Sequence, residues 1–374
     1  MAKQKSALEL AIEKLRKDFD DTDVIAWLGE YKRKSSKIQF ISTGSIDLDR
    51  ALVRGGFPTG RLVEVYGQQA SGKSTVALET VKNAIKMFPK KKVVYLDAEM
   101  AMDPDMPTNM GIDPDKFLLI QANTGNESLT ILETLIKSGE VSLAVVDSVD
   151  ALMPKEEEGK TLDDAAGVGN LPKLMSRACR KFVSLCKKTN TTIIFINQVR
   201  QKIMAFGDPE TTSGGNALPY YASMRIRVSG SGDTKKDRIL DKFGNIIGHT
   251  AHFVVRKNKL AAPYRTAEVP LIYGKGFDAT GELIRLSEDL GVVEKTKNGF
   301  YKLDPTIVSK DIEENYKGFD AFREALDGNK VLRETILDKI GTMIHYKAVD
   351  IDEKELIETD DGPIPEDECT SPED

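Results

Sequence analysis

Residues 67–75 read Gly-Gln-Gln-Ala-Ser-Gly-Lys-Ser-Thr, and the interpretation of the whole chain starts from them. Their spacing matches G-x-x-x-x-G-K-[ST], the loop that surrounds the phosphates of a nucleoside triphosphate. This motif requires a strand before it and a helix after it. Residues 62–66 are apolar and β-branched, and Val76, Leu78, Val81 and Ile85 recur with roughly helical spacing. The sequence therefore predicts a phosphate-binding P-loop, rather than a glycine turn that happens to carry a lysine.

Each position of this loop has a chemical role. The glycines let the backbone turn its N–H groups toward phosphate oxygens, and the following helix adds the positive end of its dipole. Lys73 is expected to contact the β- and γ-phosphates, and Ser74 to bind Mg²⁺. The predicted ATP-binding residues of the loop are Gly67, Gln68, Gln69, Ala70, Ser71, Gly72, Lys73, Ser74 and Thr75.

The composition of the 374 residues, 40% hydrophobic and 30% charged, is typical of a soluble protein of two or three domains. No apolar run approaches the ~20 residues that cross a bilayer, and the first residues lack the apolar core of a signal peptide. Cys179, Cys186 and Cys369 form no metal-binding or redox motif. We therefore expect a cytoplasmic protein without a membrane partner.

The remaining pattern predicts an α/β fold. Strands are expected at 93–96, 117–120, 143–147 and 192–198, and helices at 128–138 and 174–187. Nearly continuous apolar strands that alternate with helices indicate a mainly parallel sheet covered on both faces. Three β-rich runs at 224–228, 252–255 and 268–272 have no helices between them, and we expect them to extend the sheet with antiparallel strands.

Four parts follow along the chain: residues 1–37 with an amphipathic helix and a linker, the nucleotide-binding core 38–277, a small α/β domain 278–349, and an acidic tail 350–374. The helix could pack on its own chain or on a neighbouring molecule. The tail carries a charge of −11 and too few apolar residues to fold, so we expect it to be disordered. The rest of the chain carries +5, which fits either a nucleic-acid binder with a competing tail or a tail that is merely solvated.

Two carboxylates should lie near the P-loop. Asp147 closes an apolar strand some seventy residues after Lys73, and it is expected to orient Mg²⁺ directly or through water. Glu99 follows another strand, at the carboxyl edge where α/β proteins bind ligands. There it can polarise the water that attacks the γ-phosphate, and a helix cap is the competing interpretation.

Two glycine-rich segments, 156–170 and 199–216, are expected to form mobile loops beside a nucleic-acid channel. Asn197 and Gln198 precede the second of them. Unstructured insertions are the alternative. The basic residues near these loops are Lys173, Arg177, Arg180, Arg200 and Lys202. Farther along, residues 256–259 (Arg-Lys-Asn-Lys) could meet a phosphate across a subunit boundary, as an arginine finger does, or could mark an exposed basic edge strand.

Taken together, these stretches resemble the bacterial RecA-type recombinases over roughly residues 5–300. Residues 209–218, Pro-Glu-Thr-Thr-Ser-Gly-Gly-Asn-Ala-Leu, are the most specific of them. The other matching stretches, in the order of the family, are 41–45, 67–75, 97–104, 146–149, 195–198 and 257–263. The resemblance implies an ATP-dependent helical filament on single-stranded DNA that finds homologous double-stranded DNA and exchanges strands in DNA recombination and repair.

By motif position, the resemblance assigns Glu99 as the catalytic base and Gln198 as the sensor of the γ-phosphate. Lys257 and Lys259 would act on the ATP of the neighbouring protomer. Further nucleotide-binding positions are Asp103, Met106, Asp147 and Tyr273. The predicted DNA-binding residues are Val168 and Ile203, which match positions that wedge between base triplets, and Gly169, Lys173, Ser176, Arg180, Arg200, Lys202, Gly214, Gly215 and Asn216. The N-terminal helix would dock on the adjacent protomer.

Some positions depart from the family pattern. Residues 68–70 are Gln-Gln-Ala where Pro-Glu-Ser is usual, Met106 replaces an adenine-stacking tyrosine, and Pro219 replaces a basic interface residue. Two other functions stay open at this point: a hexameric helicase motor with the same fold, and a DNA-coating protein in which ATP is only structural.

The acidic tail generates a prediction. A chain that ends at Val349 should bind duplex DNA more tightly at low salt and low Mg²⁺, because a flexible polyanion on a basic surface must be displaced before DNA enters. The difference should narrow as salt screens the tail's own contact, and ATP hydrolysis on single strands should change little. Duplex-binding curves across a salt series test this, and superimposable curves at every salt would mean that the tail has no target.

Overall fold

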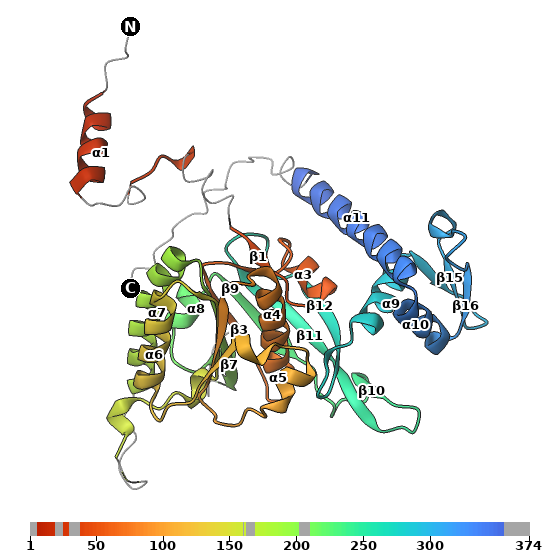
Figure 1. The fold of residues 1–374 in the computed structure, drawn as a ribbon, viewed down its shortest axis with the longest axis horizontal. Coiled ribbons are helices and arrows are strands. Elements are labelled where there is room, and N and C mark those ends of the chain that lie inside the picture. The colour runs from red at the N-terminus through yellow and green to blue at the C-terminus, as the bar shows by residue number, and fades with distance from the viewer. Residues whose placement is uncertain are drawn as a thin grey trace, which may run out of the picture.

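The computed structural model describes residues 6–18, 25–29, 38–159, 161, 169–201 and 210–354 (Figure 1). The strands of the core are β1 (Phe40–Ile41), β2 (Phe57–Pro58), β3 (Leu62–Gly67), β4 (Lys92–Asp97), β5 (Phe117–Ile120), β6 (Val141–Asp147), β7 (Thr192–Gln201), β8 (Glu210–Thr212), β9 (Met224–Ser229), β10 (Arg238–Leu240), β11 (Ile246–Asn258), β12 (Thr266–Ile272) and β13 (Gly276–Phe277). The helices before the small domain are α1 (Ala7–Asp18), α3 (Ile46–Ala51), α4 (Lys73–Met87), α5 (Asp105–Asn109), α6 (Gly125–Lys137), α7 (Asn170–Thr189) and α8 (Ala217–Tyr221).

One large sheet organises the core, with the strand order β13-β12-β11-β9-β3-β7-β6-β4-β5. The predicted parallel centre is confirmed, because β5, β4, β6, β7 and β3 all pair in parallel. The antiparallel prediction holds for β11 and β12 but is wrong for β9, which pairs in parallel with β3. Residues 202–223 between β7 and β9 include α8 and are long enough for the crossover that a parallel pair needs.

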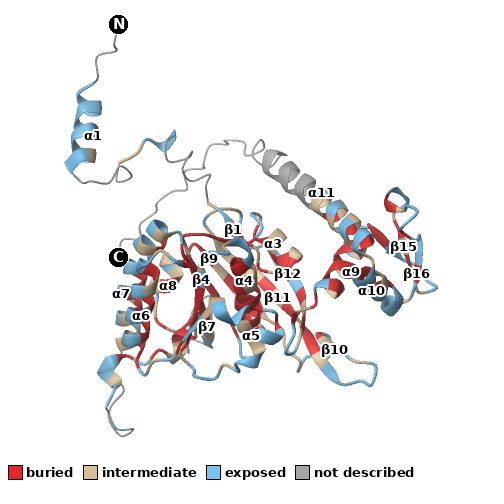
Figure 2. Cartoon of the chain, in the orientation of Figure 1, coloured by how far each residue is buried: buried red, intermediate tan, exposed pale blue. Residues whose placement is uncertain are grey.

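Helices cover both faces of this sheet (Figure 1). Val63 and Val65 of β3 pack in one hydrophobic cluster with the inner face of α4, whereas Leu62 packs in a second cluster with α6 and α7. This alternation is the period of two that a strand imposes on its side chains. Figure 2 accordingly shows the buried residues concentrated in the strands and the inner sides of these helices. α6 begins at Gly125, earlier than predicted, because Thr124 caps its first turn.

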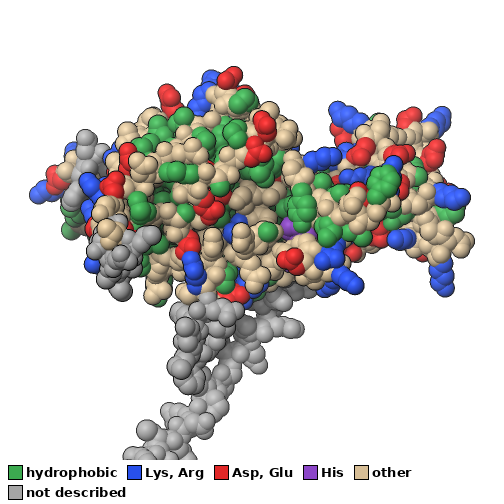
Figure 3. All heavy atoms as spheres, turned by 90° about the horizontal axis from the view of Figure 1, so that it is seen from below, with side chains coloured by type: hydrophobic (Ala, Val, Ile, Leu, Met, Phe, Trp, Pro, Cys, Tyr) green, Lys and Arg blue, Asp and Glu red, His purple; other side chains and the backbone are tan. Residues whose placement is uncertain are grey.

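The small domain contains α9 (Ala279–Asp289), β14 (Val293–Lys295), β15 (Phe300–Leu303), β16 (Asn315–Lys317), α10 (Phe319–Gly328) and α11 (Lys330–Lys354). Its own hydrophobic cluster includes the fully buried Phe322 and Leu332. The helix α11 continues five residues past the boundary predicted at 349, so truncation there also shortens this helix. The remaining tail, 355–374, lies outside the described residues. Seen from below (Figure 3), acidic and basic side chains are interspersed on this face of both domains.

A buried carboxylate joins the two domains. Glu282 of α9 accepts hydrogen bonds from Ser45 Oγ (2.5 Å) and from the backbone N–H groups of Asp47 (3.0 Å) and Ile46 (3.3 Å). It thereby satisfies orphan donors in the first turn of α3. Arg285, one turn later, donates to Asp47 Oδ2 at 2.7 Å. The small domain is therefore fixed to the core by polar contacts with the residues just before the sheet.

The N-terminal helix α1 has no buried residue, and its apolar side chains Leu8, Leu10 and Leu15 are exposed (Figure 2). Within the described residues, packing on its own chain, one of the two alternatives, is therefore not observed. Among the described helices, none has both the length and the apolar composition that a membrane span requires.

The joint between the domains generates a prediction. Burial raises the pKa of Glu282 to about 7, above its ordinary value of 4.5. The folded protein therefore holds a proton that the unfolded chain releases, so this group makes stability fall as pH rises from about 4.5 to about 7. Glu282→Gln has no such proton. The difference in free energy of unfolding between this variant and the native protein should shift in favour of the variant by about 1.4 kcal/mol for each pH unit between about 4.5 and about 7.

Denaturant unfolding at a series of pH values measures this gain. Glu294→Gln, which changes an exposed carboxylate on β14 of the same domain, serves as the control and should follow the native profile. A Glu282→Gln profile parallel to the native one would contradict the assignment.

Candidate functional site

The P-loop connects β3 to α4, and its glycines are required by their surroundings. A Cβ on Gly67 would lie 2.1 Å from the carbonyl oxygen of Val228, and Gly72 has φ +95°. Lys73 is the first residue of α4, and its Nζ donates to the carbonyl oxygen of Gln68 at 2.5 Å. Burial lowers the pKa of Lys73, and the carboxylates of Asp147 and Glu99 oppose this shift. The ammonium group is thus held inside the loop, where phosphate charge would be matched.

Asp147, at the end of β6, faces the P-loop. Its Oδ2 accepts from Ser74 Oγ at 2.7 Å and from the buried Tyr95 hydroxyl at 2.6 Å. Burial raises the pKa of Asp147, while these two hydrogen bonds act in the opposite direction. A hydroxyl and a carboxylate side by side are the oxygen ligands that Mg²⁺ takes together with phosphates and water. The pair therefore fits the predicted metal position.

Glu99 lies beyond the end of β4 and is exposed. Its Oε1 accepts from Ser148 Oγ at 2.7 Å, so the carboxylate is oriented from the residue that follows Asp147. In the described chain the next helix, α5, begins only at Asp105, after Pro104 and without a side-chain cap. The helix-cap interpretation of Glu99 is therefore wrong. Asp97, by contrast, has a structural part, because it accepts from the N–H of Met102 and from Gln121.

Strand register brings these groups to one edge of the sheet. Gly67 of β3 lies opposite Gln198 of β7, and Asp97 of β4 lies opposite Asp147 of β6. The two polar residues that end the apolar part of β7 have different environments. Asn197 is buried and donates to Glu64 Oε1 (3.1 Å) and to the Ser213 carbonyl (3.0 Å). Gln198 is left at the edge, beside the P-loop.

Lys257 and Lys259 lie at the opposite end of the sheet. Asn258 between them pairs with Met224, and Met224 pairs with Val63. Val63 is four residues, or about 13 Å, from Gly67 along β3. Lys257 Nζ donates to the carbonyls of Pro219 (2.7 Å) and Tyr220 (3.0 Å), and Lys259 Nζ donates to that of Tyr220 (3.4 Å). The two lysines are therefore remote from the P-loop of their own chain.

The edge-strand interpretation of residues 256–259 stays open, because β11 pairs with β12 only as far as Val254, whereas Lys257 and Asn258 pair with β9 alone. Burial lowers the pKa of Lys257, and the neighbouring positive charges of Lys259 and Arg225 lower it further. A negative charge from another molecule would reduce the repulsion among these positive charges.

A groove of about 480 Å³ follows one side of α7. It contains three of the predicted DNA-contacting residues, Lys173, Ser176 and Arg180, together with Arg177. Gly169, with φ +84°, forms the N-terminal cap of α7. The predicted residues of the first loop and its helix are thus brought together, except Val168, which lies outside the described residues.

The second loop is anchored where it leaves and where it rejoins the sheet. Asp150 binds both Arg200 on β7 and the Ser213 hydroxyl after β8. Gly214 has φ +82°, and a Cβ there would lie 2.9 Å from Val149. A Cβ on Gly215 would lie 3.0 Å from the Pro172 side chain at the start of α7. Asn216 then precedes α8. The predicted contacts Lys202 and Ile203 lie outside the described residues.

The predicted nucleotide contacts outside the P-loop occupy separate loops. Asp103 is exposed before α5, and Met106 of α5 packs partly on the core cluster of α4. Tyr273 follows β12, and its hydroxyl lies 3.2 Å from Nδ1 of the buried His249. The structure does not place these three side chains in one pocket.

Sequence reasoning missed the residues that orient the site. Tyr95 lies inside an apolar strand, where it looks like a core residue, and Ser148 and Asp150 are ordinary polar residues after a strand. The signal that could have found Ser148 and Asp150 is their position just after Asp147, at the edge where the P-loop was expected.

The comparisons with known proteins agree with this geometry. The RecA N-terminal domain family matches residues 6–278. The Protein RecA of Lactobacillus acidophilus is 42% identical over 304 residues, which cover 80% of each chain. The Protein RecA of Sulfurovum sp. is 39% identical over 362 residues, covering 96% of this chain and 99% of the relative. That of Lactobacillus johnsonii is 38% identical over 94% of this chain and 92% of its own.

Proposed function

The chain belongs to the RecA family, and on this premise we propose how its residues divide the work of an ATP-dependent DNA recombinase. The protein is a recombinase with DNA-dependent ATPase activity, and the family implies ATP binding with magnesium, DNA binding and filament formation. Family membership thus decides against the helicase motor and the DNA-coating protein. The residue roles below are proposals.

The observation that carries the proposal is the register at the carboxyl edge, where Gly67 lies opposite Gln198 and Asp97 opposite Asp147. The P-loop amides and Lys73 bind the phosphates of ATP. Ser74 and Asp147 would hold Mg²⁺, which would neutralise charge on the phosphates. Gln198 contacts the γ-phosphate, and its strand continues into the second DNA loop. Asp103, Met106 and Tyr273 are assigned to the base of ATP from their motif positions alone.

Hydrolysis requires an activated water. Glu99 accepts a proton from the water whose oxygen attacks the γ-phosphorus, and the bond to ADP breaks as phosphate forms. Ser148 orients the carboxylate through the 2.7 Å hydrogen bond. The exposed position of Glu99 allows water to reach it.

Completion of the site needs a second copy of the chain. Lys257 and Lys259 are too far from their own P-loop to contact its phosphates, so we assign them to the ATP of the neighbouring protomer. The exposed apolar face of α1 docks on that neighbour. Stacking of protomers therefore builds the active site and the helical filament together.

DNA occupies the groove along α7 and the region of the two loops. Lys173 and Arg180 neutralise phosphates, and the backbone around Gly214 and Gly215 approaches the strand closely. Single-stranded DNA binds first, and homologous double-stranded DNA is the second partner. Cytoplasmic location, expected from the cysteines, stays a prediction.

Substitutions of Lys73 and of Glu99 should impair different steps, ATP binding and ATP hydrolysis. Lys73→Ala should lose productive ATP binding, because the phosphate charge loses its partner. Glu99→Gln should bind ATP and DNA but hydrolyse ATP at least about 100-fold more slowly than the native protein, which leaves long-lived filaments. Nucleotide titration and DNA-stimulated phosphate release separate the two effects. Turnover by Glu99→Gln at the native rate would place the base elsewhere.

Lys257→Ala and Lys259→Ala should bind nucleotide as single protomers but lose DNA-stimulated hydrolysis. Mixing either with Lys73→Ala protein should restore some turnover, because each protein keeps the half-site that the other lacks. Phosphate release across mixing ratios measures this. No recovery at any ratio, in filaments shown to contain both proteins, would contradict the assignment to the neighbour.

Strand exchange tests the function itself. With ATP, a circular single strand and a homologous linear duplex should give joint molecules, and a non-homologous duplex should give none. Equal products from both duplexes, or none from either, would contradict recombination.

A further inference from the structure

The turn that follows β6 contacts both the proposed catalytic base and the second loop. It contains the short 3₁₀ helix η2 (Val149–Ala151), and Ser148 directly before this helix donates to Glu99 Oε1 at 2.7 Å. A hydrogen bond from the Ala151 N–H to the Ser148 carbonyl (3.2 Å) closes the turn, and Val149 inside it is fully buried. Because the turn is closed by a hydrogen bond and packed into the core, its residues should move together.

Asp150, the middle residue of η2, joins the two ends of the second loop. One of its carboxylate oxygens binds the guanidinium group of Arg200 on β7, and the other accepts from the Ser213 hydroxyl after β8. The two ends are neighbours because β8 pairs antiparallel with β7. Gly214 adds an apolar contact, since a Cβ there would lie 2.9 Å from Val149. The base of the second loop is thus packed on η2.

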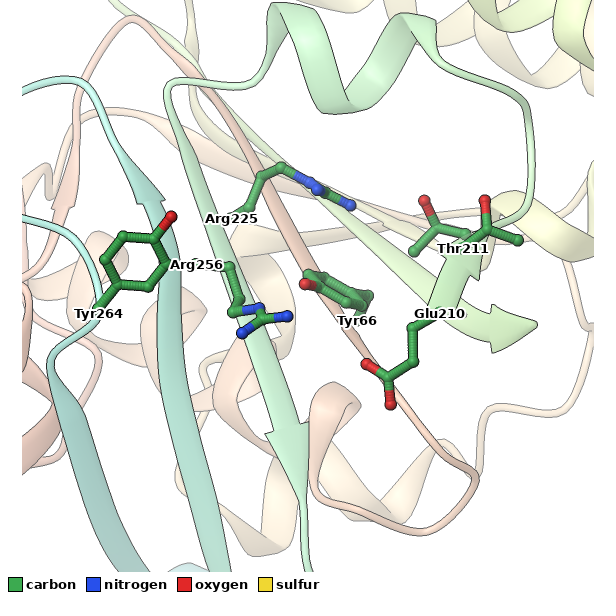
Figure 4. Close-up of a pocket in the computed structure, with 7 residues that line it drawn as sticks. Tyr66, Glu210, Thr211, Arg225, Arg256 and Tyr264 are labelled. Carbon is green, nitrogen blue, oxygen red and sulfur yellow. The ribbon is translucent and has the colours of Figure 1, made fainter. Parts of the chain in front are cut away.

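The strand β8 is also fixed to the main sheet. Glu210 accepts two hydrogen bonds from Arg227 of β9, of 2.7 and 2.5 Å. Figure 4 shows Tyr66 of β3 between β8 on one side and the arginines of β9 and β11 on the other. Tyr66 and Glu210 line a cavity of about 240 Å³ there. The base of the second loop is therefore held by two contacts, one with the sheet and one with η2, and a rearrangement of the loop must act on one of them.

Arg200 gives DNA a means to act on η2. Its side chain is 58% exposed although it is paired with Asp150, and Arg200 is one of the predicted DNA contacts. A guanidinium group binds carboxylates and phosphates with the same geometry, so a phosphate of DNA can compete with Asp150 for it. Exchange of an exposed ion pair costs little free energy. The partner of Arg200 would then differ between the DNA-free and the DNA-bound protein, and coupling between two sites requires such a difference.

We propose that Asp150 is a positioning residue that couples DNA at the second loop to the catalytic base, an inference that rests on the proposed recombinase function. When a phosphate takes Arg200, the carboxylate of Asp150 loses one of its two partners. The turn then adjusts, and Ser148 brings Glu99 into position. DNA thereby raises the rate of hydrolysis through a residue that need not touch it. This route is separate from the one through Gln198 and β7.

Asp150→Asn tests the proposal, because the amide keeps an oxygen for the Ser213 hydroxyl but lacks the charge that holds Arg200. Affinity for oligothymidylate is measured with a slowly hydrolysed ATP analogue, and ATP hydrolysis is measured with and without the DNA. The variant should bind DNA roughly twofold to fivefold more tightly, because an exposed ion pair no longer competes. The stimulation of hydrolysis by DNA should fall at least about fivefold, because the coupling is lost.

The control is Asp338→Asn, which removes an exposed carboxylate from α11 and should match the native protein in both measurements. The two effects expected of Asp150→Asn have opposite signs, which separates coupling from mere support of the loop. A purely structural Asp150 would leave a loosened loop, so weaker DNA binding by the variant overturns the proposal. Tighter binding with native stimulation also overturns it, since Asp150 would then only repel DNA.

A double-mutant cycle tests the route through Ser148. Ser148→Ala removes the hydrogen bond to Glu99 and should lower the stimulation by itself. If Asp150 acts through Ser148, the addition of Asp150→Asn to Ser148→Ala should lower the stimulation no further. Losses that multiply in the double variant overturn this route.

Ser213→Ala tests the second contact of Asp150 without a change of charge. It should lower the stimulation while the slope of log affinity against log salt stays native, because no cation is gained or lost. Native stimulation in both Ser213→Ala and Asp150→Asn overturns the inference and leaves the proposed function intact. A native protein whose hydrolysis DNA does not stimulate would instead refute the proposed function, and this inference with it.

Discussion

The pairing of β3 with β7 is the constraint on which the site depends. Gly67 and Gln198 lie opposite each other in a parallel ladder that helices bury on both faces, so neither strand can slip without moving its side chains to the wrong face. Val228 closes the other side of Gly67, where a Cβ would approach its carbonyl oxygen to 2.1 Å. One strand therefore holds the phosphate loop, and its neighbour holds Gln198, for which we propose contact with the γ-phosphate, and then continues into the second loop.

The same sheet explains why one copy of the chain is incomplete. Its carboxyl edge carries Lys73, Glu99 and Asp147, whereas Lys257 and Lys259 lie near the amino end of β3. A rigid sheet cannot fold these two ends together. We propose that a neighbour in the same orientation brings one edge to the other, and that repetition of this contact builds the filament that the family implies. The exposed apolar face of α1 is consistent with such stacking.

Local patterns in the sequence were sufficient for the P-loop, the parallel centre and the carboxylates at its edge. They were insufficient where partners come from distant strands. The parallel pairing of β9 depends on the crossover through α8, which the hydrophobic pattern did not reveal. Tyr95 supports Asp147, and Glu282 caps α3, yet both partners are distant in the chain. The contacts of Asp150 with both ends of the second loop are likewise visible only once the strands are in place.

We propose that β7 transmits the state of the nucleotide from Gln198 to the second loop. The most direct measurement is the ratio of single-strand affinities with a slowly hydrolysed ATP analogue and with ADP, for the native protein and for Gln198→Ala. The native protein should bind single strands more tightly with the analogue than with ADP, and Gln198→Ala should have a ratio near one even though it still binds the analogue. A variant that binds the analogue and keeps the native ratio would contradict it.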